Sequence, residues 1–176
     1  MQVIEHYEVP SGGVSSIVLD EIPDTFTDLY LVFSLRSFPT NTRGYDDMGM
    51  RLNGSTTNYS DRFLRTREGA VSSGAGSGTS LAAFSMNRYE DNTFATGSVY
   101  IPNYTSSNPK SISNDGYSTG NTTTSVTGGI LAGLWNDSTA INSITLLSLN
   151  GNSILQYSSA TLYGILAGSD GTTTVS

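Results

Sequence analysis

Apolar and polar residues alternate along much of this chain with the period of two that is typical of strands with one face in a core. Residues 29–38 show the pattern most clearly. One side of this run is apolar and the other is mixed, which predicts a strand whose second face is only partly covered. A helical period fits less well because Tyr, Val and Phe crowd the segment. The apolar side consists of Leu29, Leu31, Phe33 and Leu35.

Further runs of this kind, separated by turn-forming residues, predict a protein made of eight or so short strands. Residues 59–67 also fit a short helix, and we favour a strand there. The pattern as a whole indicates an all-β fold, an antiparallel β-sandwich of the jelly-roll type. The candidate strands span residues 3–9, 14–19, 29–38, 47–52, 59–67, 81–89, 93–102, 130–135, 141–149 and 159–165.

Two polar segments interrupt the pattern. Residues 71–80 are almost entirely Gly, Ser and Ala, and we expect a long exposed loop within the domain rather than a linker between domains. Residues 102–125 are also polar, with weak strand signals only at 110–113 and at Tyr117. The pattern predicts tyrosine-bearing loops there.

Residues 136–165 hold two apolar, β-rich runs on either side of Asn150-Gly151. Both residues tolerate the positive φ of a type I′ turn, so the stretch predicts a terminal β-hairpin or a pair of neighbouring strands. Residues 155–159 are polar and irregular, and the firm part of the second strand is expected at 160–165.

A length of 176 residues predicts one domain with one hydrophobic core. We expect the sandwich to span residues 14–167. Residues 1–13 form an N-terminal segment, and residues 168–176 form a flexible C-terminal tail. Both ends are polar extensions that could attach the domain by adding a strand to the edge of a neighbour.

Composition narrows the classes of function. The chain has no cysteine, so disulfides and thiolate metal sites are excluded. A net charge of −7 without a basic stripe argues against nucleic acid as a partner. No apolar run approaches the ~20 residues that cross a bilayer, so membrane insertion is not expected. The N-terminus lacks a basic segment followed by an apolar run, so we expect no signal peptide.

Candidate catalytic and metal-binding side chains are few. His6 is the only histidine, and it lies in a polar strand at the N-terminus. The acidic residues Asp46-Asp47, Asp61 and Glu90-Asp91 could form a pair for glycoside hydrolysis or part of a calcium shell, but their spacing matches no known calcium loop. We interpret His6 as an exposed strand residue and the acids as solvated loop charges. No catalytic residue, metal or cofactor is therefore predicted.

Aromatic residues suggest contacts rather than chemistry. Tyrosines can stack on sugar rings, pack in subunit interfaces or simply fill a sheet. We name Tyr100, Tyr104 and Tyr117 as candidate interface or glycan contacts, because they lie in or near the polar segment 102–125. Trp135, flanked by Leu131 and Leu134, is expected in the core.

Three segments of the chain, taken in order, carry a resemblance to a known family. The first is Ser11-Gly-Gly-Val-Ser-Ser-Ile-Val-Leu, continuing through Ile22-Pro-Asp-Thr-Phe-Thr-Asp-Leu-Tyr-Leu-Val-Phe-Ser-Leu-Arg36. The second is Met50-Arg-Leu-Asn-Gly54, followed by Tyr59. The third is Gly133-Leu-Trp-Asn-Asp-Ser-Thr-Ala-Ile-Asn-Ser-Ile-Thr145, ending in Leu162-Tyr-Gly-Ile165. With these segments spread over nearly the whole chain, the sequence resembles virion structural proteins of tailed bacteriophages, especially marine and cyanobacterial ones.

The resemblance implies a non-enzymatic β-sandwich subunit of the virion, either a capsid decoration (cement) protein or a head-fibre or tail-fibre subunit. It also implies a homotrimer that binds other virion proteins of the capsid or tail. An alternative is a receptor- or carbohydrate-binding module at the tip of a tail fibre, with a glycan of the host surface as its ligand. A more distant alternative is a depolymerase acting through Asp46 and Asp47.

Overall fold

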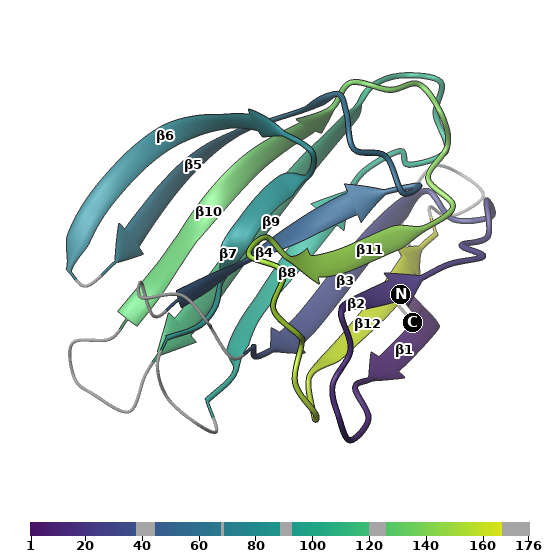
Figure 1. The fold of residues 1–176 in the computed structure, drawn as a ribbon. Coiled ribbons are helices and arrows are strands. Elements are labelled where there is room, and N and C mark those ends of the chain that lie inside the picture. The colour runs from purple at the N-terminus through teal and green to yellow at the C-terminus, as the bar shows by residue number, and fades with distance from the viewer. Residues whose placement is uncertain (38–44, 68, 89–92, 120–125, 167–176) are drawn as a thin grey trace.

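The computed structural model describes residues 1–37, 45–67, 69–88, 93–119 and 126–166, and only the backbone of Tyr45 and of residues 82–88. Within these ranges the chain forms two antiparallel sheets that face each other (Figure 1). The small sheet has the order β2 (Ser16–Leu19), β11 (Ile144–Ser148), β4 (Tyr45–Leu52) and β7 (Leu81–Arg88). The large sheet has the order β1 (Gln2–Glu8), β12 (Ser159–Ile165), β3 (Asp28–Leu35), β8 (Ala95–Ile101), β9 (Lys110–Thr119), β10 (Val126–Trp135), β5 (Tyr59–Arg67) and β6 (Ala70–Gly78). The predicted all-β sandwich is confirmed.

The strand order is that of a jelly roll with additions. The order β1-β12-β3-β8 in one sheet and β2-β11-β4-β7 in the other is the order of two interleaved Greek keys. The remaining four strands form two insertions, β5 with β6 and β9 with β10. Both insertions extend the large sheet beyond β8. We call these four strands the added strands.

The core lies between the two sheets and follows the alternation in the sequence. In β3 the four predicted apolar residues are buried, and so are Met48, Met50 and Leu52 in β4. Trp135 at the end of β10 is buried and stacks on Tyr59 with ring centroids 6.3 Å apart. The expectations for strand 47–52 and Trp135 are therefore confirmed, and that for strand 29–38 is confirmed over residues 29–35.

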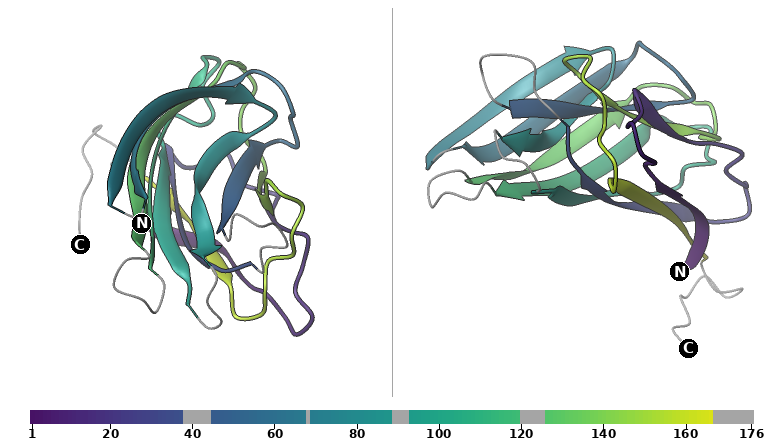
Figure 2. Two further views of the ribbon diagram at one scale, coloured as in Figure 1. Left: turned by 60° about the vertical axis from the view of Figure 1, so that its left-hand side comes forward. Right: turned by 60° about the horizontal axis from the view of Figure 1, so that its bottom comes forward.

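The large sheet is strongly curved. Figure 2 shows the added strands bending around the small sheet on the side of β7. The inner face of the large sheet is covered by the small sheet. No described strand lies over its outer face, which is therefore a broad open surface (Figure 2).

The prediction of a loop at 71–80 is wrong, because Ala70–Gly78 is strand β6 and pairs with β5 without a register shift. The small residues of β6 accommodate bulky residues of β5. A Cβ atom on Gly74 would lie 2.5 Å from Cζ of Phe63, and one on Gly76 would lie 2.6 Å from Oδ1 of Asp61. The glycines make room for these two side chains. The Gly-rich composition, which is typical of a linker, is therefore explained here by packing between two strands.

The prediction of loops in 102–125 is wrong for residues 110–119, which form strand β9 (Lys110–Thr119) between β8 and β10 and include the weak strand signals at 110–113 and Tyr117. Its inward residues include Lys110, Asn114 and Ser118, which are polar and buried. The ammonium group of Lys110 donates hydrogen bonds to the carbonyl oxygens of Ser106 and Asn108, at 2.8 and 2.7 Å. A strand that buries polar side chains shows little alternation in the sequence.

The predicted terminal hairpin does not form. β11 pairs with β2 and β4 in the small sheet, while β12 pairs with β1 and β3 in the large one. Only Gly151 of the Asn150-Gly151 pair has a positive φ. The expected left-handed conformation occurs instead at Asn53-Gly54, where φ is 51° and 65°. The 150–151 turn thus connects the two layers of the sandwich.

Residues 2–8, part of the expected attachment segment, form β1 at one edge of the large sheet. β1 is hydrogen-bonded to β12 of the same chain, and only its outer edge is free to pair. Attachment through strand addition there remains a prediction. The tail at 168–176 lies outside the described residues.

Candidate functional site

The carboxylates of Asp46 and Asp47 point to different surroundings. Asp46 is fully buried and accepts hydrogen bonds from the hydroxyl groups of Ser37 (2.6 Å) and Ser148 (2.8 Å). It also accepts one from Nδ2 of Asn150, at 2.8 Å. Asp47 is partly exposed and forms an ion pair with Arg67 at 3.3 Å. A carboxylate enclosed by three donors supports a structural role rather than that of a hydrolytic acid or base.

The other acidic candidates do not complete a site. Asp61 is buried on β5 against Gly76, and Glu90 and Asp91 lie outside the described residues. Within the described ranges, no three His, Asp or Glu side chains are grouped so that they could hold a metal ion. His6 lies on β1, where its Nδ1 is 2.8 Å from the hydroxyl of Thr161 in an exposed contact.

The three tyrosines named from the sequence are not brought together. Tyr104 is fully buried, and its hydroxyl donates a hydrogen bond to the carbonyl oxygen of Pro23. Tyr104 is therefore wrong as a surface contact, because its ring fills the core. Tyr100 is partly exposed and donates to Asp28 at 2.9 Å, and Tyr117 is half exposed on β9.

Tyr100 belongs to a row of tyrosines that the sequence does not reveal. On the outer face of the large sheet, Tyr30 of β3 pairs directly with Tyr100 of β8 on one side and with Tyr163 of β12 on the other. Residues in register on adjacent strands lie about 5 Å apart, so the three side chains form a continuous strip. Their sequence positions are far apart, and only the strand order brings them into one row.

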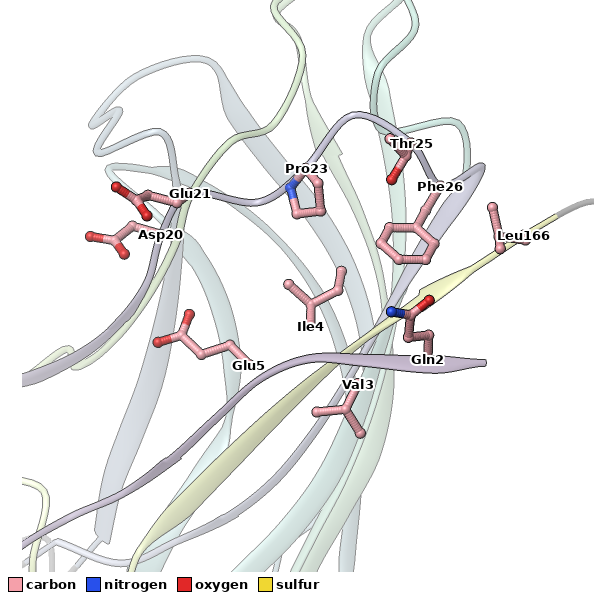
Figure 3. Close-up of a pocket in the computed structure, with 10 residues that line it drawn as sticks. All are labelled: Gln2, Val3, Ile4, Glu5, Asp20, Glu21, Pro23, Thr25, Phe26 and Leu166. Atoms are coloured by element: carbon pink, nitrogen blue, oxygen red, sulfur yellow. The ribbon is translucent and has the colours of Figure 1, made fainter.

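One pocket lies at the β1 edge of the sandwich (Figure 3), with a volume of about 580 Å³. Glu5, Asp20 and Glu21 lie at one end of it, and Phe26 and Leu166 at the other (Figure 3). Burial and the neighbouring carboxylate of Asp20 raise the pKa of Glu5. The pocket is acidic and open, and its lining contains neither a nucleophile with a base nor a histidine.

A second surface lies on the outer face of the added strands. Six large apolar side chains there are 38–73% exposed, although all of them belong to regular strands. The register places them on neighbouring strands, so that they form one surface. We call this surface the apolar patch, and it consists of Leu64, Val71, Tyr117, Val126, Ile130 and Leu134.

The apolar patch is shaped by small residues of β10. The ring of Tyr117 lies over Gly128, where a Cβ atom would be 2.5 Å from Cδ1 of the ring. A shallow groove of about 550 Å³ runs over Ile130 and Ala132 between β5 and β9, and a second of about 320 Å³ lies beside Val71 and Tyr117. The patch therefore has an aromatic ring that lies against the sheet and hollows into which other side chains can insert.

One sequence signal could have revealed this surface. Residues 130–135 of β10 read Ile-Leu-Ala-Gly-Leu-Trp, which is apolar at both alternating sets of positions. Such a run is typical of strands that are covered on both faces. In the structure Leu131 and Trp135 face the core, while Ile130 and Leu134 face outward and are exposed.

Comparisons with known proteins do not add to the geometry. No protein-family model matches the chain, and no curated protein matches it significantly. The described part of the chain contains no helical segment with the length and hydrophobicity that a membrane crossing requires.

Proposed function

We propose that this protein is a non-enzymatic structural subunit of a phage virion, either a capsid decoration protein or a fibre subunit. The observation that carries the proposal is the apolar patch, which leaves six large apolar side chains exposed on a rigid sheet. Contiguous patches of this kind mark sites that bind a protein, a ligand or a membrane, and we propose a protein partner here. The three sequence segments resemble phage virion proteins, and we therefore propose that this contact is made in a virion.

The candidate catalytic residues Asp46 and Asp47 have surroundings that support a non-enzymatic role. The buried Asp46 is held by three donors, and Asp47 is neutralised by Arg67. Glycoside hydrolysis needs two carboxyl groups facing each other across a cleft. No described pocket offers that arrangement together with a sugar-binding surface, so we propose binding rather than catalysis.

Quantitative mass spectrometry of purified particles of the encoding phage tests the proposal. The chain is expected to be present after the particles are washed at high salt. Copy numbers on the order of hundreds would assign it to capsid decoration, and a few tens or fewer to a fibre or tail. Its absence from the particles, with abundant chain in the infected cells, would refute a virion role.

A second candidate function is carbohydrate binding at a fibre tip, favoured by the row of Tyr30, Tyr100 and Tyr163. Aromatic side chains in a strip can stack against sugar rings. A glycan array would show retention that is lost in a Tyr30→Ala variant and kept in a Tyr157→Ala variant, whose tyrosine is exposed outside the row. Binding that is unchanged by Tyr30→Ala would exclude the row as the site.

A further inference from the structure

The apolar patch is as large as the largest apolar patch of a typical monomer, and patches of that size are often functional. Its six side chains account for six of the fourteen large apolar residues that are exposed in the described part of the chain. All six lie on the outer face of four adjacent strands. Together they expose several hundred Å², about the size of the largest patch on a typical monomer. With its polar border, such a surface approaches the ~800 Å² per partner of a stable interface.

Two charged side chains border the groove in the middle of the apolar patch. Arg62 on β5 is paired in register with Ala132 of β10, and Asp115 on β9 is paired with Ile130. Strands β5 and β9 lie on opposite sides of β10, so the two residues are separated by about 10 Å across the sheet. No ion pair joins them within the chain. Arg62 donates to the carbonyl oxygen of Asp61, and Asp115 accepts from the hydroxyl of Ser98.

This arrangement of charges is self-complementary. A two-fold axis that runs roughly along β10, between two copies placed face to face, lays β5 of one copy over β9 of the other. Arg62 of each copy then faces the part of the opposite β9 that carries Asp115. A two-fold interface requires this reciprocity, because each residue must meet its complement twice.

We propose that the apolar patch is a homodimer interface whose occupant is the patch of a second copy of this chain. The outer faces of the two large sheets pack with strands crossing at the ~30° usual for aligned sheets. Around an axis that runs along β10, Ile130 of one copy packs against Ile130 of the other, and the Arg62–Asp115 pairs set the orientation. The inference deepens the proposed function, since it names the partner of the same surface. It differs from the trimer that the family resemblance implies.

A second copy fits better than a foreign chain of one charge. Among the described residues, Arg62 and Asp115 place one cation and one anion on opposite sides of the patch, so a uniformly acidic or basic partner would leave one of them opposed to a like charge. A rotated copy of the same surface satisfies both. Apolar contact supplies the affinity, and the charge pairs supply the register.

Sedimentation velocity of the purified full chain over a wide concentration range tests the proposal. The wild type is expected to be a dimer and Ile130→Asp a monomer, because the new carboxylate would be buried in the interface. Val18→Asp is the matched control, since Val18 is an exposed valine on the small sheet. It should remain a dimer. Circular dichroism verifies that each variant is folded.

Charge reversal gives a second test that does not depend on the apolar residues. Arg62→Glu and Asp115→Arg should each weaken dimerisation about tenfold or more, and the double variant should recover most of that loss. A wild type that is monomeric or trimeric, an Ile130→Asp variant that stays dimeric, or a double variant weaker than both single ones would overturn the proposal. Each of these outcomes concerns the oligomer only. Detection of the chain in virions decides the proposed function separately.

Discussion

Asp46 provides the sharpest test of how this sandwich is held together. Its carboxylate lies on β4 and joins the β3 end at Ser37 to the β11 end at Ser148 and Asn150. The hydroxyl oxygen of Ser148 in turn accepts hydrogen bonds from the backbone amides of Asn150 and Asn152, both at 3.0 Å. The perturbation is Asp46→Ala, which removes the acceptor at the centre of this network.

The expected cost follows from the three hydrogen bonds. A hydrogen bond to an ionised group contributes about 1.5–3 kcal/mol, and burying a carboxylate has a desolvation penalty that its removal recovers. Ser37 loses its acceptor, while Ser148 keeps its bonds to the two amides. We therefore expect Asp46→Ala to lower the free energy of unfolding by about 3 kcal/mol, less than the sum of three full bonds.

Urea denaturation followed by tryptophan fluorescence measures the change, because Trp135 is the only tryptophan and lies in the core. Asp47→Ala is the matched control. It removes the neighbouring carboxylate and its partly exposed ion pair with Arg67, which should cost about 1 kcal/mol or less. Equal losses in the two variants, or a neutral Asp46→Ala, would refute the assignment of Asp46 as a structural anchor.

Other residues give further tests. Gly74→Val should lower the free energy of unfolding by about 1–3 kcal/mol in urea denaturation, because the new side chain would collide with Phe63. Gly78→Ala on the same strand has open space and should be neutral or stabilising by up to about 1 kcal/mol; equal losses in the two variants would contradict the packing argument. Tyr104→Phe loses the hydrogen bond to Pro23 and should cost about 1 kcal/mol at neutral pH. Burial raises the pKa of Tyr104 above its usual 10.0, so this residue's contribution is present below pH 10 and is lost as the pH rises further. The wild type should then lose more stability above pH 10 than Tyr104→Phe, and parallel curves would contradict the burial of the phenol.

The sequence predicts best those strands whose burial pattern does not depend on which strands they pair with. β3, β4 and β12 alternate because each presents one face to the core, and this requirement is visible in any single strand. β9 also presents one face to the core, but its sequence does not alternate clearly between apolar and polar residues, because the polar residues Lys110 and Asn114 face inward. β6 does not show this alternation either, because its inward positions are glycines that leave room for side chains of β5.

The failed hairpin has a different cause. A turn signal such as Asn150-Gly151 is local, whereas the pairing of β11 and β12 is decided by strands at least 92 residues earlier, as for Ile144 with Leu52. The carboxylate of Asp46 fixes the turn from the neighbouring strand β4. A local signal can predict that the chain reverses there. It does not predict that the chain changes sheets.

The candidate site was only partly predictable. The burial of Tyr104 follows from its loop passing over the sandwich near Pro23, a contact between residues 81 positions apart. The row of Tyr30, Tyr100 and Tyr163 depends on strand order in the same way. The apolar patch differs, because residues 130–135 are apolar on both faces of the strand, and this pattern is visible in the sequence.

The position of the apolar patch within the topology connects the fold with the proposed function. A jelly roll closes with eight strands, and here those strands are β1 to β4, β7, β8, β11 and β12. Every residue of the patch lies instead on the added strands. Their inner faces contribute Tyr59 and Trp135 to the core, which explains how the insertions are held in place. Core packing does not account for the exposed Ile130 and Leu134 on their outer faces, and the proposed contact with another chain would account for them. The insertions thus give a closed sandwich a second apolar face, and this is the face that the proposed assembly would bury.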